Sequence, residues 1–309
     1  MEATSTPSSP HVSVVICTRN REDKIGQAVN SVLASNYSSF DVTVIDQSTS
    51  DATGAVLRPI AAGDERLRYH HVEQAGLSRA YNTGIAASSG EVLAFTDDDC
   101  IVPPDWITNI VSAFAAEPDS DLLYGQVIPL AGLDDNQGWS PKLEIHEPRR
   151  LSRGDGWHIF GMGANFAARR RLFVEVGPFD VVLGGGGPLR SSQDFDLAYR
   201  TFHAGRVTLL RPEVMLEHDG RREAADWPSL LVAYGTGDGA FYTKHVRCRD
   251  VYALWLAVRR VFQSAWRLAA KTVLRRPGTE GPYLKGFVKG VRDSFKFKVD
   301  RATRLYVEN

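Results

Sequence analysis

Three consecutive carboxylates, Asp97, Asp98 and Asp99, follow directly after an apolar segment at 91–96. Acids crowded this closely repel one another unless a cation or solvent relieves the repulsion. A hard divalent ion prefers oxygen ligands and usually takes one or two protein carboxylates, with water and phosphate oxygens completing its shell. The position after a strand therefore favours a Mg²⁺ or Mn²⁺ site over its alternative, a solvated acidic loop.

A second acidic group stands in "SSQDFDLAYR", where Asp194 and Asp196 open a helix predicted over about 192–204. A carboxylate near a helix N-terminus is favoured by the helix dipole, so capping is the alternative to a catalytic role. Four consecutive glycines at 184–187 precede it. A flexible segment beside such an acid suits a loop that orders over substrate.

These acids need a framework that brings them together, and the first hundred residues supply one. Short β-branched runs alternate there with helical stretches, with strands expected at 11–17, 41–46, 66–72 and 91–96 and helices at about 22–34 and 77–88. This alternation predicts βαβ units, that is, an α/β fold with a Rossmann-like, mainly parallel sheet. Such sheets bind ligands at the carboxyl ends of their strands, where "CTRNRED", "DQSTSD" and "DDDC" stand.

Several function classes are excluded by composition and motifs. The net charge of -1 argues against nucleic acid as a partner. Neither the dinucleotide fingerprint G-x-G-x-x-G nor the Walker P-loop follows the first strand. The glycine-rich "GMGANF" from Gly161 and "GTGDGA" from Gly235 do not follow a strand in a βαβ unit, so we expect turns or close helix packing there.

With these motifs the chain resembles an inverting family 2 glycosyltransferase of the GT-A fold. The strongest piece is "VLAFTDDDCIVPPDWI" from Val92, which is similar to the family's strand, DxD motif and helix start. The remaining pieces follow in the family's order between residues 11 and 218: "VSVVICTRNR", "VTVIDQSTSD", "GLSRAYNTGI", "GANFAARRRLFVEVGPFD" and "SSQDFDLAYR". The resemblance implies transfer of a hexose from a nucleotide sugar, commonly a UDP-sugar, to an acceptor hydroxyl with inversion.

The resemblance also implies roles for individual residues. The nucleotide-sugar site is implied for Thr18, Arg19, Asn20, Asp46, Arg79, Asn82, Asp97 and Asp98. Metal binding is implied for Asp99, with Asp97 and His218 as further candidates, although a lone histidine is more often structural. The Mg²⁺ or Mn²⁺ ion would bridge the donor phosphates and offset charge on the departing diphosphate. Asp194 would be the general base that takes the acceptor proton.

The chain departs from the family pattern at three places. Gln47 follows Asp46 where a second acid is common, Gln193 precedes Asp194 where a glutamate is common, and Tyr81 occupies the slot where relatives often place an arginine. Trp157 and His158 suit either a sugar subsite or a hydrophobic anchor.

Charge and periodicity divide the chain further. We expect a disordered lead at 1–10, a catalytic domain at 11–243 with a nucleotide-sugar half (11–121) and an acceptor half (122–243), and a basic extension at 244–309. The extension holds 16 Lys and Arg against 5 Asp and Glu, and apolar residues recur at helical spacing over 251–269. Such a helix either lies on an anionic membrane or packs on the catalytic domain. Membrane contact would suit a lipid-linked acceptor, while a saccharide acceptor is the other alternative. We expect a cytoplasmic protein, located at the inner face of the membrane if the helix docks there.

Two alternatives to a transferase remain at this level. A sugar nucleotidyltransferase also places phosphates over a Rossmann-like sheet, but it needs a glycine-rich basic loop after the first strand, which "CTRNRED" lacks. A catalytically silent scaffold that docks through the basic extension would not need its carboxylates, yet the acidic triplet and Asp194 are present.

Overall fold

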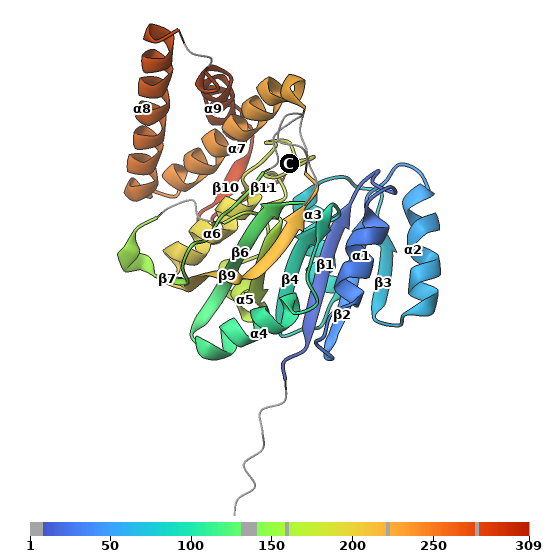
Figure 1. Cartoon of the computed structure of the whole chain (residues 1–309). Helices are drawn as coiled ribbons and strands as arrows, with labels where there is room; N and C mark the ends of the chain where they lie inside the picture. Colours follow the sequence, from blue (N-terminus) through green and yellow to red (C-terminus); the bar gives the residue numbers. More distant parts are fainter. Residues whose placement is uncertain (1–8, 131–140, 158–160, 221–222, 276–277, 309) are drawn as a thin grey trace, which may run out of the picture.

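The computed structural model describes residues 9–130, 141–157, 161–220, 223–275 and 278–308. Within these residues a nine-stranded mixed sheet carries helices on both faces, and a group of helices follows it at the C-terminal end (Figure 1). Except for residues 9 and 10, the predicted lead lies outside the described residues. The α/β fold with a mainly parallel sheet is confirmed.

The first half is a run of βα units whose four strands are parallel and lie in the order β3-β2-β1-β4. Its elements are β1 (Val12–Thr18), α1 (Ile25–Leu33), β2 (Phe40–Asp46), α2 (Ala52–Gly63), β3 (Leu67–His71), α3 (Leu77–Ala87) and β4 (Val92–Asp97). The sequence pattern predicts each of these except α2, which contains Pro59.

Strand register explains why the polar residues meet at one edge of the sheet. Thr18, the last residue of β1, pairs with Asp46 at the end of β2. Cys17 pairs on the other side with Asp97 at the end of β4. Parallel strands of equal register end side by side, so the loops after β1, β2 and β4 share one rim.

The second half adds mixed strands on the other side of β4. β8 is antiparallel to both β4 and β6, whereas β6 and β9 are parallel. Its elements are β5 (Cys100–Ile101), α4 (Trp106–Ala116), β6 (Ser120–Pro129), β7 (Arg149–Leu151), β8 (Asn165–Arg169), α5 (Arg170–Val176), α6 (Gln193–His203) and β9 (Val207–His218). The short β5 pairs antiparallel with the end of β9 and so closes the sheet next to the acidic triplet.

Helices cover both faces because alternate residues of each buried strand point to opposite sides. Val14 packs with the helices of one face, including Val29 of α1, and Val15 packs with those of the other, including Tyr81 of α3. Phe95 belongs to the second cluster, with Tyr81 edge-on to its ring at 5.3 Å between centroids. The sheet is therefore a buried, rigid support for the loops at its rim.

The C-terminal part is helical and packs on the second face. It comprises α7 (Trp227–Arg247), α8 (Val251–Val273), α9 (Glu280–Ser294), β10 (Lys298–Asp300) and β11 (Leu305–Val307). α7 runs through residues 243 and 244, where we expect the domain boundary. Its glycines lie against α9: a Cβ atom at Gly235 would stand 2.1 Å from the carbonyl oxygen of Tyr283. Among the described residues, no helix combines the length and apolarity needed to cross a membrane.

Candidate active site

The acidic triplet meets His218 because β5 pairs with β9 and sets Cys100 opposite that histidine. Asp99 Oδ1 lies 3.1 Å from His218 Nε2, and the backbone amide of Asp219 donates to the carbonyl of Asp99 at 2.8 Å. Arg21, from the loop after β1, reaches Asp99 Oδ2 at 3.4 Å. Sequence reasoning did not single out Arg21, although it stands in the "CTRNRED" loop that was expected at this rim.

Crowding of charge perturbs this cluster. Burial and the neighbouring charge of Asp99 raise the pKa of Asp97 to about 7. Burial also raises the pKa of Asp98 to about 6, although a hydrogen bond from Thr18 opposes the shift. For Asp99, burial acts upward, but the bond to His218 outweighs it and leaves the pKa below its usual value. The pKa of His218 is raised by that same pair against the effect of burial.

Asp98 contacts the loop that follows β1. Thr18 Oγ1 donates to Asp98 Oδ2 at 2.7 Å, and both side chains are buried. The backbone of Arg19 donates to the same carboxylate. Asp98 thus fixes the loop after β1 to the acidic segment.

The donor atoms present fit a divalent cation. Asp99, Cys100 and His218 each offer a ligand atom, these atoms lie within 4.8 Å of one another, and all three residues are buried. A carboxylate and an imidazole are ligands that Mn²⁺ and similar ions accept, whereas a thiol is a softer donor. Asp97 stands outside this group of three.

Asp194 lies at the N-terminal end of α6, after Ser192, which has a positive φ of 71°. Its Oδ1 accepts from the backbone amide of Phe195 at 2.9 Å, and Gly163 approaches its other oxygen. Burial raises the pKa of Asp194 to about 6 against these hydrogen bonds. Its charge is also one of the smaller causes that raise the pKa of Asp97, after burial and the charge of Asp99.

A buried ionic network holds α6 in place. Lys244 of α7 is fully buried, and its Nζ lies 2.6 Å from both Asp180 and Asp196. Asp196 also pairs with Arg200 at 2.9 Å and with His245 at 2.9 Å. Burial raises the pKa of Asp196, but the surrounding cations hold it well below its usual value. Every charge in the network has a partner of opposite sign. Removing one member would therefore leave a buried charge without its partner.

Two loops form the predicted nucleoside side. Asn20 adopts a positive φ of 54°, and its backbone amide donates to Ser48 Oγ at 2.8 Å. Asp46 is fully buried and accepts from the amide of Ser48 and from the hydroxyl of Tyr69. These contacts tie the loops after β1 and β2 together.

Gln47, one of the three departures from the family pattern, has a specific structural role. Its Nε2 donates to the carbonyls of Gln74 and Gly76 at 2.7 and 3.2 Å, and its Oε1 accepts from the amide of Gly76 at 3.1 Å. An aspartate or glutamate has no donor for these carbonyls when ionised. The amide therefore connects the loop after β2 to the start of α3.

Two predicted residues have their side-chain groups engaged elsewhere. Arg79 forms an ion pair with Glu308, near the C-terminal end of the chain. Both polar atoms of the Asn82 amide bond to the backbone of Phe179 at 2.9 Å. Asn82 thus braces the segment that leads to the glycine run at 184–187.

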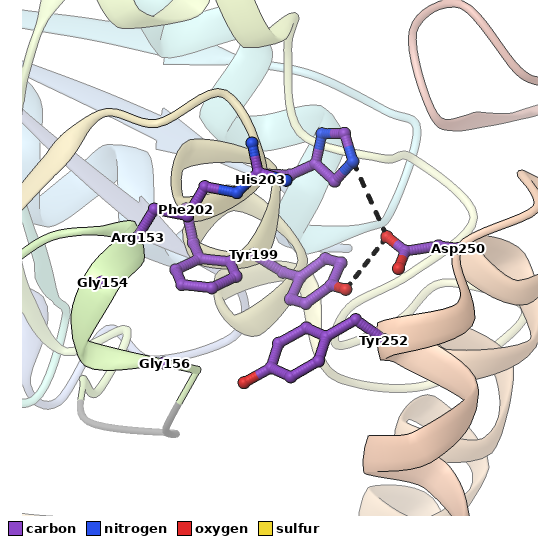
Figure 2. Close-up of a pocket in the computed structure, with 8 residues that line it drawn as sticks. All are labelled: Arg153, Gly154, Gly156, Tyr199, Phe202, His203, Asp250 and Tyr252. Atoms are coloured by element: carbon purple, nitrogen blue, oxygen red, sulfur yellow. Dashed lines mark hydrogen bonds and ion pairs between the residues drawn. The ribbon is translucent and has the colours of Figure 1, made fainter.

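Trp157 is 4% exposed and packs edge-on against Tyr199 at 5.1 Å between ring centroids. Of the two roles that the sequence left open, a sugar subsite and a hydrophobic anchor, this packing supports the hydrophobic anchor. His158 lies outside the described residues. A separate cavity of about 310 Å³ lies nearby, and Figure 2 shows Tyr199 and His203 turned toward Asp250 in it. Since His203 is nine residues beyond Asp194 on α6, roughly 13 Å along the helix, this cavity is separate from the acidic cluster.

Comparison with known proteins finds glycosyltransferases. The family model "Glycosyl transferase family 2" matches residues 13–177. A glucosyl-dolichyl phosphate glucuronosyltransferase of Haloferax volcanii is 27% identical over 57% of this chain and 58% of its own. Glycosyltransferase AglE of the same organism is 34% identical over 59% of this chain and 60% of its own. The matched part thus spans about three-fifths of the length of these curated relatives.

Solved structures share the fold. The mannosyltransferase PcManGT from Pyrobaculum calidifontis, in complex with GDP-Man and Mn²⁺, superposes with a TM-score of 0.62 at 16% identity, over 93% of this chain and 88% of that one. S. aureus TarS 1-349 in complex with UDP-GlcNAc gives a TM-score of 0.56 at 18% identity, over 72% of this chain and 66% of that one. Because the family match covers 165 of the 309 residues, the protein belongs to glycosyltransferase family 2.

Proposed function

We propose that this protein is a metal-dependent inverting glycosyltransferase that moves a sugar from a nucleotide sugar, a UDP-sugar in our proposal, to an acceptor hydroxyl. The observation that carries the proposal is the buried pair of Asp99 and His218 at the rim of the sheet, whose Oδ1 and Nε2 atoms lie 3.1 Å apart. Asp194, at the N-terminal end of α6, adds a second carboxylate whose charge contributes to the raised pKa of Asp97.

Family membership supports a glycosyl transfer, and the geometry supports a division of labour. Asp99 and His218 would hold Mg²⁺ or Mn²⁺, with Asp97 beside them. When bound, the ion supplies Lewis-acid stabilisation of the departing diphosphate. The loops carrying Thr18, Asn20 and Asp46 would hold the nucleoside, since they form one connected rim.

Asp194 would act as the general base. As the acceptor oxygen attacks the anomeric carbon from the face opposite the diphosphate, Asp194 takes the hydroxyl proton and the bond from carbon to phosphate oxygen breaks. The configuration inverts because attack and departure occur on opposite faces. A pKa of about 6 suits this role, because the carboxylate is ionised at neutral pH yet more basic than an exposed aspartate.

The acceptor in this proposal is a saccharide or a lipid-linked saccharide. One curated relative is named for a glucosyl-dolichyl phosphate substrate, which supports a lipid-linked acceptor. One solved neighbour holds a GDP-linked sugar and another a UDP-linked sugar, so the nucleobase of the donor is a matter for direct measurement.

Titration calorimetry of UDP, GDP and dTDP, with and without Mn²⁺, tests the donor and metal assignments. We expect one nucleotide to bind in a metal-dependent manner and Asp99→Asn to weaken that binding. Asp119→Asn is the matched control, since Asp119 is 63% exposed and pairs only at the surface with Arg150. Binding of no nucleotide under either condition would refute the proposal.

The base assignment needs a second measurement. Asp194→Asn should keep nucleotide binding but lower the rate of transfer by roughly 10²- to 10⁴-fold, the usual contribution of a general base. Transfer at an unchanged rate would show that Asp194 is not the base. Loss of nucleotide binding in the same variant would assign Asp194 to the donor site instead.

A further inference from the structure

Helix α8 exposes a stripe of large apolar side chains along its length. Val258 is 60% exposed, and Phe262 and Trp266 are each 68% exposed. The exposed apolar stripe consists of Val251, Trp255, Val258, Phe262, Trp266 and Val273, at the three-, four- and seven-residue intervals that place side chains on one face of a helix. The sequence pattern left open whether this face packs on the catalytic domain, and the structure shows that it does not.

The opposite face of α8 fixes the direction of the stripe. Ala253, Leu256 and Ser264 are buried on that side. Arg260 lies over the ring of Tyr283 at 5.0 Å and donates to its hydroxyl at 2.9 Å, which anchors α8 to α9. Because the helix is held by its other face, the stripe is turned to the outside.

The charges of α8 are all of one sign. Residues 251–273 contain four basic and no acidic residues. Arg259 lies over the ring of Trp255 at 5.3 Å and so borders the stripe, whereas Arg267, eight residues further along, is exposed on another side of the helix. Within the part of the chain that the structure describes, neither of these two arginines makes an ion pair with a carboxylate. The surface thus combines exposed apolar side chains with uncompensated positive charge.

We propose that the exposed apolar stripe of α8 docks on an anionic lipid bilayer, with the helix lying flat in the interface. A bilayer offers an apolar interior for Phe262 and the valines, and anionic head groups for Arg259 at the edge of the stripe. Tryptophans such as Trp255 and Trp266 favour this boundary, where the ring is buried and its N–H stays near water.

A second copy of the chain fits this surface less well. A two-fold symmetric contact would set the α8 face against itself. The Arg259 side chains at the edges of this face would then be brought into the contact from both copies, and the helix contains no acid to offset them. Charge complementarity therefore selects an anionic surface.

Vesicle co-sedimentation of the full chain tests the proposal, using phosphatidylcholine vesicles with and without phosphatidylglycerol. We expect the wild type to bind the anionic vesicles and Val258→Asp to weaken binding at least about tenfold, because a charge must enter the apolar layer. Val174→Asp is the matched control: Val174 is 84% exposed on α5 and carries the same change of residue and charge. Both sites are exposed, so neither variant is expected to unfold the protein.

Arg259 gives an independent test. Replacing Arg259 by glutamine should lower the affinity for anionic vesicles about fivefold, since a basic residue near such a surface contributes about that factor. The same variant should bind neutral vesicles no differently from wild type. Equal loss on both vesicle types would contradict the electrostatic part of the proposal.

The docking surface is independent of the proposed transferase activity, and the experiment separates the two. Asp194→Asn should bind vesicles as wild type does, even if it has no transferase activity. No vesicle binding by wild type would overturn the proposal, as would equal losses from Val258→Asp and Val174→Asp. If light scattering found a dimer that Val258→Asp dissociates, with no vesicle binding, a second copy would cover the stripe instead.

Discussion

Replacing Gly290 by alanine should destabilise the protein through a clash between two helices. α7 and α9 cross so closely that glycines of each helix lie against backbone carbonyls of the other. A Cβ atom at Gly290 would stand 2.0 Å from the carbonyl oxygen of Thr236, and one at Gly286 would stand 2.2 Å from that of Val232. These obstacles are backbone atoms, which cannot rotate away as a side chain can.

The size of the effect follows from the distance. Real Cβ atoms essentially never approach another heavy atom below 3.0 Å, so α9 must shift by about 1 Å or more from α7 at Gly290. Overpacking a core costs about 1–3 kcal/mol, and an unyielding backbone places this site at the upper end. Alanine is favoured over glycine in a helix by about 1 kcal/mol, which leaves a net loss of about 2 kcal/mol in the free energy of unfolding.

The same helix supplies a control. At Gly281, also in α9, an added Cβ atom has no neighbour within 4 Å. Gly281→Ala should therefore be neutral or stabilise the protein by up to about 1 kcal/mol. Urea unfolding followed by circular dichroism measures both variants under identical conditions. Equal midpoints for Gly290→Ala and Gly281→Ala would refute the close-crossing argument.

Three further predictions concern charge and hydrogen bonding. Lys244→Met should lower the free energy of unfolding by about 3–5 kcal/mol, because it leaves Asp180 and Asp196 buried without their shared cation. Urea unfolding measures this loss. A loss below about 1 kcal/mol would contradict the stabilising role of the ionic network. The rate of transfer should fall about tenfold from pH 7 to pH 5, because Asp194, with a pKa of about 6, is mostly protonated at pH 5 and a protonated base accepts no proton. Initial rates at saturating metal test this. A rate that rises on acidification would exclude Asp194 as the base. Gln47→Glu should weaken nucleotide binding severalfold, since a carboxylate repels the carbonyl oxygens to which the Gln47 amide donates. Calorimetry with the preferred nucleotide measures this affinity. An unchanged affinity would show that the loop after β2 is not part of the nucleotide site.

Local patterns in the sequence determined the framework of this protein. The alternation of β-branched runs with helical stretches predicts β1–β4 with α1 and α3, and the structure confirms them within a few residues. The acids at the strand ends could also be predicted, because in parallel strands the ends of equal register must meet. The family 2 motifs occur within these same segments, so the family could also be predicted from short stretches of the chain.

Only the tertiary structure decided which distant residues meet. Asp99 and His218 become neighbours through the pairing of β5 with β9, and no local pattern encodes that pairing. The burial of Lys244 among carboxylates was equally hidden, since a single lysine in a basic segment looks like a solvated one. Contacts such as these depend on chain segments far apart in sequence.

The orientation of α8 shows the same limit. Its periodicity predicts an amphipathic helix, and the structure confirms the helix over Val251–Val273. The spacing alone is identical whether the apolar stripe is buried or exposed, because periodicity fixes only which side chains share a face. The anchoring of the other face through Arg260 and Tyr283 turned the stripe outward, and that required the packed neighbours to be in place.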